Sequence, residues 1–144
     1  MASWTAYMQN AIVDAVMRGQ PLPSVPVFYF GLHLSSYYHQ SAEISTIDPA
    51  YQRIAIPANM INFSGTQGAG SVTESTGTSG VISNNVAISF PPASVDWGRI
   101  ESMSMWDAPT FGNMWVLSNL TQTADIFQGD PFTIPPSRFN ITLS

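Results

Sequence analysis

The chain has 144 residues, a length that fits one domain with its own hydrophobic core. It contains no cysteine, which excludes disulfides, thiolate metal sites and cysteine nucleophiles. Only 9% of the residues are charged and the net charge is −5; the four cations are single, scattered arginines, so nucleic acid is excluded as a partner.

The first segment, residues 1–20, is predicted to be an amphipathic helix. Ser3 is the expected N-cap, and apolar residues recur at helical spacing until Gly19 and Pro21 end the helix. A proline-rich linker, residues 21–26, follows. Two interpretations of the helix stay open: it packs on its own domain, or it reaches a neighbouring copy of the chain.

Residues 27–144 are predicted to form a single antiparallel β-sandwich or jelly-roll-like domain, so the fold class is mainly β with a short N-terminal α-helix. Short alternating segments are separated by Gly, Pro and Asn, without a βαβ rhythm. The expected strands are 27–34, 51–56, 59–63, 86–90, 99–106, 114–120, 132–134 and 138–143. Residues 64–80, rich in Gly, Ser and Thr, are expected to form a long flexible loop or a ragged hairpin.

Two of the expected strands have assignable faces. In 27–34 the Phe and Leu side chains alternate onto the expected core face, and His33 lies on the opposite face. In 99–106 the alternation places Met103 on one face and Ile100 on the other.

Candidate catalytic and metal-binding residues are few. The two histidines, His33 and His39, have only Glu43 as a nearby carboxylate, so a structural or solvent-exposed role is favoured over a metal site. No serine lies in a Gly-x-Ser-x-Gly elbow. We expect no catalytic residue, no metal and no cofactor, and hence no enzyme.

A carboxylate pair is the one enzymatic alternative. Asp96 and Asp107 flank the same expected strand, and a glycosidase needs two carboxylates across a sugar site. The indoles of Trp97, Trp106 and Trp115 would then supply stacking faces for the sugar. Each aspartate also lies beside residues typical of turns, and we favour this turn interpretation.

The composition also predicts assembly. Polar positions are filled with Ser, Thr, Asn and Gln, which are cheaper to desolvate against another protein than charged groups are. The surface is therefore expected to contact copies of the chain or a larger assembly; a Ser/Thr-rich extracellular β domain would have a similar composition. The start of the chain has no signal-peptide pattern, and no apolar run has the length of a membrane span, so we expect neither secretion by that route nor a membrane partner.

An ordered set of short motifs extends from residue 51 to the C-terminus. Phe-Pro ends one strand, Trp-Gly begins the next where the backbone must bend, and Asp, Gly-Asn and Gly-Asp form connections. The motif residues are Tyr51, Arg53, Phe90, Pro91, Asp96, Trp97, Gly98, Asp107, Gly112, Asn113, Gly129 and Asp130. In order and spacing the motifs resemble a family of small tailed-bacteriophage virion proteins, often labelled tail fibre proteins, some of which are similar to capsid decoration (cement) proteins.

The resemblance implies a structural protein of the virion. We expect a capsid decoration protein that forms a homo-oligomer, a trimer, on the head and stabilises the shell by bridging copies of the major capsid protein. The alternative is a tail fibre or baseplate adaptor, or a module that binds a host glycan through Trp106 or Trp115. Candidate interface residues, chosen by residue type, are Trp4, Tyr7, Tyr37 and Tyr38.

Overall fold

The computed structural model describes residues 2–34 and 43–142. Within them the fold is mainly β, with antiparallel sheets and one α-helix near the N-terminus, which confirms the expected class. The elements are β1 (Ala2–Trp4), α1 (Ala6–Arg18), β2 (Val27–His33), the 3-10 helix η2 (Ile44–Thr46), β3 (Ile54–Pro57), β4 (Val81–Ser83), β5 (Ile88–Phe90), β6 (Gly98–Trp106), β7 (Met114–Ile126), β8 (Phe132–Ile134) and β9 (Asn140–Thr142). No helix among the described residues has the length and apolar character that crossing a bilayer requires.

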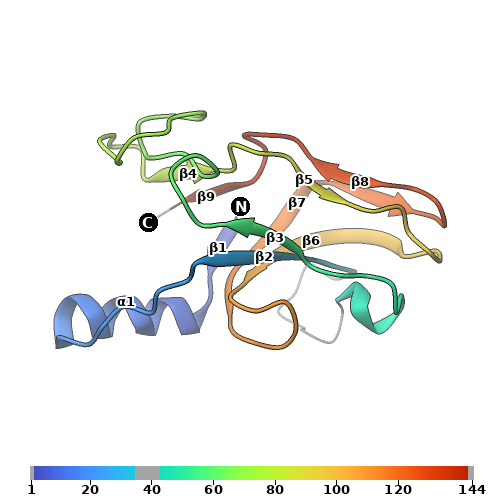
Figure 1. Ribbon diagram of the computed structural model, residues 1–144, viewed down its shortest axis with the longest axis horizontal. Helices are drawn as coiled ribbons and strands as arrows, with labels where there is room; N and C mark the ends of the chain where they lie inside the picture. The colour runs from blue at the N-terminus through green and yellow to red at the C-terminus, as the bar shows by residue number, and fades with distance from the viewer. Residues whose placement is uncertain (1, 35–42, 143–144) are drawn as a thin grey trace.

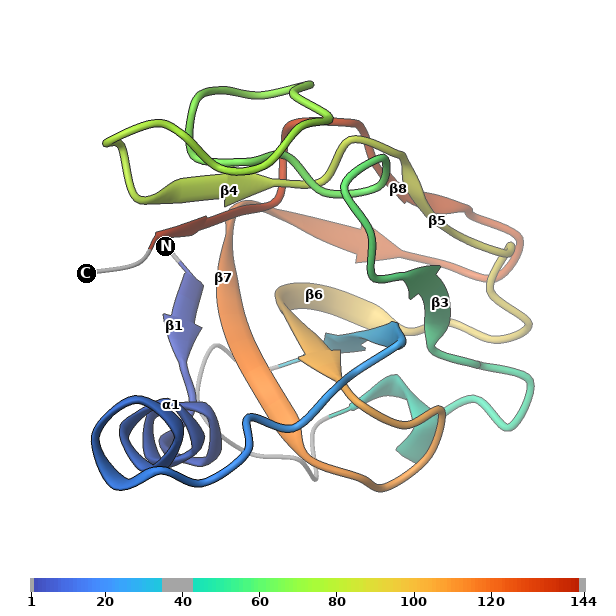
Figure 2. The ribbon, with the colours of Figure 1, turned by 60° about the vertical axis from the view of Figure 1, so that its left-hand side comes forward.

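The described strands form two sheets. The larger has seven strands in the order β3-β2-β6-β7-β1-β9-β4, and the smaller pairs β5 with β8. Every pair is antiparallel except β1 with β9, which is parallel. In Figures 1 and 2, β4, β9 and the small sheet lie on one side of the molecule, β2, β3 and β6 lie on the other, and the long β7 runs between them.

The core fills the space between these two sides. Phe90 and Phe132 of the small sheet belong to the same buried cluster as Phe30, Met103 and Ile141 of the large sheet. The large sheet thus contributes to both sides: β4 and β9, with the small sheet, face β2, β3 and β6 across one core, which gives a sandwich-like arrangement.

The N-terminal segment differs from the expected continuous helix. Trp4 lies in β1, which pairs with β7, and the N-cap is Thr5 rather than Ser3. The Thr5 hydroxyl accepts a hydrogen bond from the Met8 backbone N–H at 3.4 Å. Gly19 ends the helix in a left-handed conformation (φ 70°), as expected. Residues 2–4 pair with a strand more than a hundred residues away, and no local periodicity signals such pairing.

The helix packs on its own domain along one side. Met8 packs against the core, and Tyr7 contacts the ring of Trp115 edge-on with centroids 5.5 Å apart. None of its residues is fully buried, and Figure 1 shows α1 extending beyond the sheets. The interpretation that the helix covers its own sandwich therefore describes only part of its surface.

Strands β2 and β6 are buried on both faces where residues 30–33 of β2 pair with residues 102–105 of β6. His33, expected on the face opposite the core, is 2% exposed. Ile100 belongs to the same buried cluster as Met103, although simple alternation separated them. The β6–β7 pairing also has a register shift between Ile100 and Ser102, and its extra residues lie in β7.

The expected strand at 59–63 is not formed. The Asn59 side chain accepts the backbone N–H groups of Ile61 and Asn62, so a local turn takes the donors that a strand would need. Phe63 makes only an isolated bridge to Asn84.

The strand β4 has no counterpart among the strands expected from the sequence. Asn84 directly after it is 1% exposed. Its side chain donates to the carbonyls of Val86 and Pro135 and accepts the backbone N–H of Phe139. These bonds join the residue after β4 to the segment 135–139, which leads into β9.

Residues 64–80 form an irregular loop organised by hydrogen bonds. The Gln67 amide donates to Thr73 and to the Glu74 carbonyl, and its oxygen accepts the Thr76 backbone N–H. The loop is not a hairpin, because no strands form within residues 64–80; Ser, Thr and Gln side chains supply hydrogen bonds that a ladder would otherwise make.

Candidate functional site

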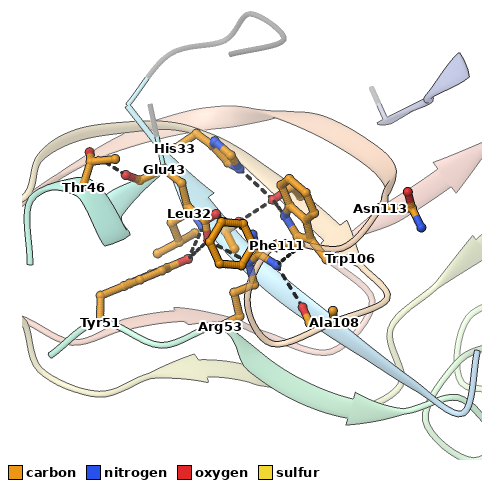
Figure 3. A network of polar contacts seen from close by, with 12 residues as sticks. Leu32, His33, Glu43, Thr46, Tyr51, Arg53, Trp106, Ala108, Phe111 and Asn113 are labelled. Carbon is orange, nitrogen blue, oxygen red and sulfur yellow. Dashed lines mark hydrogen bonds and ion pairs between the residues drawn. The ribbon is translucent and has the colours of Figure 1, made fainter. Parts of the chain in front are cut away.

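A buried ion pair joins Glu43, directly before η2, to Arg53, directly before β3 (Figure 3). Arg53 Nε donates to Glu43 Oε2 at 3.0 Å, and Arg53 Nη2 donates to Glu43 Oε1 at 2.9 Å. The two side chains are only 7% and 5% exposed. This bidentate ion pair has a fixed geometry. Removing either partner would leave the charge of the other buried without a counter-charge.

The Nη1 group of Arg53 holds the connection between β6 and β7. Arg53 Nη1 donates to the carbonyls of Ala108 and Phe111, both at 2.9 Å. The guanidinium carbon also lies 3.9 Å from the ring centroid of Trp106. One side chain thereby fixes residues 107–113 to the body of the domain, a geometry that suits the planar fork of arginine and not lysine.

Tyr51 and Gly31 complete the surroundings of the carboxylate. The Tyr51 hydroxyl donates to Glu43 Oε2 at 3.0 Å and accepts the Leu32 backbone N–H at 2.8 Å. Burial and the charge of Glu43 raise the pKa of Tyr51 well above its usual range, so the hydroxyl stays a donor. A Cβ on Gly31 would lie 2.7 Å from Glu43 Oε2, so only glycine lets the carboxylate approach β2.

His33 belongs to a second, adjoining set of polar contacts. Its Nε2 lies 2.7 Å from Ser104 Oγ, which also accepts the Trp106 indole N–H at 2.6 Å. Among the described residues, no three His, Asp or Glu side chains converge as metal ligands. His39 lies outside the described residues.

The connection 107–113 is also braced from within. Asp107 Oδ1 accepts the Asn113 backbone N–H at 2.7 Å, and Oδ2 accepts the Asn113 side chain and the Trp115 indole. Burial raises the pKa of Asp107, but these hydrogen bonds outweigh it and leave the pKa below the usual value. Gly112 has a φ of 74°, and a Cβ there would lie 2.6 Å from that of Ala108.

Phe111 lies at the tip of this braced connection. Its side chain is 88% exposed, and its backbone has a φ of 55°, a conformation that large side chains rarely adopt. Beside it is an open surface hollow of about 880 Å³, lined by residues of β2, of the segment 43–55 and of 106–112. Figure 3 shows Phe111 beside Arg53, whose bonds hold its carbonyl.

Asp48 is a further buried carboxylate, in a turn in which its own carbonyl accepts the Tyr51 backbone N–H. It accepts hydrogen bonds from the Ser94 hydroxyl at 2.5 Å, the Ser94 backbone and the Trp97 indole at 2.8 Å. The bonds from Ser94 and Trp97 hold the pKa of Asp48 far below its usual value.

The remaining motif residues lie in the core or in turns. Phe90 stacks on Tyr51 with centroids 6.1 Å apart, and Pro91 follows it at the end of β5. Asp96 accepts the Gln128 backbone N–H, and Asp130 accepts that of Phe127. Gly98 and Gly129 have φ values of 89° and 88°, as turn or bend positions require.

The structure does not bring Asp96 and Asp107 together. They flank the nine-residue β6. At about 3.3 Å per residue its ends lie on the order of 25 Å apart, whereas glycosidases separate their carboxylates by about 5–10 Å. The faces of Trp106 and Trp115, 2% and 4% exposed, are covered by protein and cannot stack on a sugar. The expected glycan contact through these two indoles is therefore wrong.

The structure describes two of the four candidate interface residues. Trp4 is half-buried, and its indole N–H donates to the Thr142 carbonyl at 3.0 Å, which ties β1 to β9. Tyr7 is 36% exposed beside Trp115. Tyr37 and Tyr38 lie outside the described residues.

Sequence reasoning missed three residues of the site: the role of Glu43 as the partner of Arg53, the role of Ser104, and Phe111. A signal existed for the first. In a chain with only four cations, an arginine inside an apolar strand pattern needs a buried acid, and Glu43 is close in sequence. No local pattern identifies Ser104 or Phe111.

A search of the curated proteins found no match. The model of the family described as Podophage GP4 fiber I protein gp80 matches residues 3–142. The matched range contains all twelve motif residues, and the description names a fibre protein, not a capsid decoration protein. The chain belongs to this podophage fiber I protein family and is a bacteriophage virion protein.

Proposed function

We propose that the chain is a structural module of a tail fibre, in which a rigid β domain is assembled in several copies. The observation that carries this proposal is the family match, which spans the domain from β1 to β9. The bracing of the 107–113 connection by Arg53 and Asp107 supports it, since a fibre module must hold its surface loops in place under load.

A capsid decoration role is the second candidate, with the major capsid protein as partner. The low charge favours it, because closely packed copies on a lattice would otherwise repel one another. Quantitative mass spectrometry of purified particles separates the two. For a tail fibre module we expect a small number of copies of this chain per particle, matching the symmetry of the tail. A copy number close to that of the major capsid protein would place the chain on the head. Absence of the chain from the particle would contradict both the fibre and the capsid proposal.

The exposed side of α1 supports assembly as a homo-oligomer, which we propose is a trimer. Val13, Val16 and Met17 are 51%, 74% and 77% exposed. The two charges of the helix, Asp14 and Arg18, pair with each other at 2.7 Å, so the apolar face meets no like charge in a second copy.

Light scattering after size exclusion tests this assembly. Val16→Lys combined with Met17→Lys is expected to convert an oligomer into monomers, because it places charges in the proposed contact. Val72→Lys is a matched control, since Val72 is 53% exposed in the loop 64–80. A monomeric wild-type chain, or equal effects of both variants, would contradict the proposal.

A role without catalysis is also proposed. Asp96 and Asp107, the two candidate acids, each accept backbone N–H groups of a turn. Their replacement by asparagine is expected to change stability only, as argued in the Discussion.

A further inference from the structure

A second surface hollow lies between β7 and the segment that leads from β8 into β9. Its volume is about 440 Å³, within the roughly 300–1,000 Å³ range of ligand sites. Its walls are residues 118–122 of β7, 132–134 of β8 and 137–140. None of the described residues that line it also lines the hollow beside Phe111, so the two hollows are separate.

The β7 wall of this hollow contains strand residues without a strand partner. On the β6 side, the register shift between Ile100 and Ser102 places residues 120–123 opposite a single residue of β6. On the other side, the pairing with β1 ends at Ser118. Within the part of the chain that the structure describes, residues 120–123 therefore pair with no strand on either edge. Such an edge is a template for an added strand, because its N–H and C=O groups still need hydrogen-bond partners.

The neighbouring strand β1 shows that a strand fits between two of these walls. Ala2 pairs with Ser118 of β7 and, on its other edge, with Ile141 of β9, so β1 lies between the two (Figure 2). Continued past Ala2, the line of β1 runs between residues 119–122 and residues 137–140 of the hollow. Strand β8, the third wall, pairs only with β5 among the described strands, so its other edge is open. An extended segment on this line would lie beside β7 in the way that β1 does.

Arg138 supplies the charge of this hollow. It is the charged residue among the described residues that line it, and it is exposed. The other three arginines each pair with a carboxylate, whereas Arg138 has none at ion-pair distance within residues 2–34 and 43–142. A turn holds it in place: the Arg138 backbone N–H donates to the Pro135 carbonyl at 3.3 Å, and Ser137 inside the turn has a φ of 69°. A bound segment with a carboxylate would supply a counter-charge, and a basic segment would be repelled.

We propose that this hollow binds an extended acidic segment of another polypeptide of the particle by strand addition. The backbone of that segment pairs with residues 120–123 of β7, and an aspartate or glutamate side chain of the segment pairs with Arg138. The inference deepens the proposed fibre role and rests on it, because that role supplies the second polypeptide. Its test uses peptides and the isolated chain, whereas the fibre role is tested by counting copies per particle, so the two failures are distinguishable.

A peptide titration of the full chain, followed by amide NMR shifts, tests strand addition. The probe is acetyl-Thr-Val-Asp-Val-Thr-amide, added to about 5 mM. We expect it to shift the amide signals of Thr121, Gln122 and Thr133, and to slow the hydrogen exchange of Thr121 or Gln122. Methylation of the peptide's backbone nitrogens at both valines and the aspartate is expected to abolish binding, because it removes the donors of the added strand.

The role of Arg138 is tested by changing the charge on either side of the contact. The peptide with asparagine in place of aspartate is expected to bind the wild type about two- to fivefold more weakly, as for an exposed ion pair. In Arg138→Gln the two peptides are expected to bind equally. Arg99→Gln is the matched control, because Arg99 is an exposed arginine outside the hollow, and it is expected to keep the preference for aspartate.

The inference is overturned if the acidic peptide leaves these three amide signals unshifted, if the N-methylated peptide binds as tightly as the unmodified one, or if Arg138→Gln and Arg99→Gln have equal effects. Shifts of the same signals when the wild-type chain alone is diluted would assign the hollow to a second copy of the chain and would also overturn it.

Discussion

Glu43 and Arg53 form a bidentate ion pair that is almost entirely out of water, with side chains 5% and 7% exposed. The pair links the turn at η2 to the connection between β6 and β7, since Arg53 also donates to two carbonyls there. A chain with 9% charged residues thus uses two of them to hold the walls of the surface hollow beside Phe111.

Arg53→Lys is expected to lower the free energy of unfolding by about 2–4 kcal/mol, because lysine cannot make the bidentate pair and both carbonyl bonds at once. Urea denaturation measures the loss. Arg99→Lys is the control: Arg99 pairs with Asp125 at 3.5 Å on the surface with its side chain 61% exposed, and a change within about 0.5 kcal/mol is expected. Equal losses of unfolding free energy in Arg53→Lys and Arg99→Lys would contradict the proposed stabilising role of Arg53.

Gly31→Ala is expected to destabilise the fold by about 1–3 kcal/mol, because the new Cβ would lie 2.7 Å from Glu43 Oε2 and 3.0 Å from Ser104 Oγ. A double-mutant cycle with Glu43→Ala measures how much of this loss comes from the carboxylate. The penalty of Gly31→Ala is expected to shrink in that background; an unchanged penalty would contradict the role of the carboxylate and assign the loss to the Ser104 and Tyr51 hydroxyls, which lie 3.0 and 3.1 Å from the added Cβ.

Asp48 predicts a specific acid sensitivity. Its pKa is depressed in the folded state by the bonds from Ser94 and Trp97, so its contribution to stability is complete above the unfolded-state pKa, about 4. That contribution is lost as the pH falls below about 4 toward the folded-state pKa. Melting temperatures between about pH 2 and pH 6 are expected to fall more steeply for the wild type than for Asp48→Asn; parallel curves would contradict the assignment.

Asp107→Asn is expected to lower the free energy of unfolding by about 1 kcal/mol, since an amide oxygen replaces a carboxylate that accepts bonds from Asn113 and Trp115. Asp96→Asn keeps an oxygen acceptor for the Gln128 N–H and is expected to lower the free energy of unfolding by less than Asp107→Asn does. Thermal melts measure both. Oligosaccharide hydrolysis by the wild type that either substitution abolishes would contradict the structural role proposed for these aspartates.

The periodicity of the sequence determined the class of the fold and several elements. The strand at β2, the end of the helix at Gly19 and the aromatic core position of Phe90 follow from patterns a few residues long, because side-chain alternation and glycine conformations are local properties. The order of the motifs also pointed to the phage virion family that the family match bears out.

Tertiary structure alone decided the pairing of β1 with β7 and β9, the register shift near Ile100, and the close approach of Glu43 to Gly31. Each depends on segments that are distant in sequence or on a Cβ-free approach between two backbones, and neither leaves a local pattern. The exposure of Phe111 is of the same kind. A phenylalanine in a short connection is expected to turn inward, and it faces solvent here because Arg53 and Asp107 hold the backbone around it.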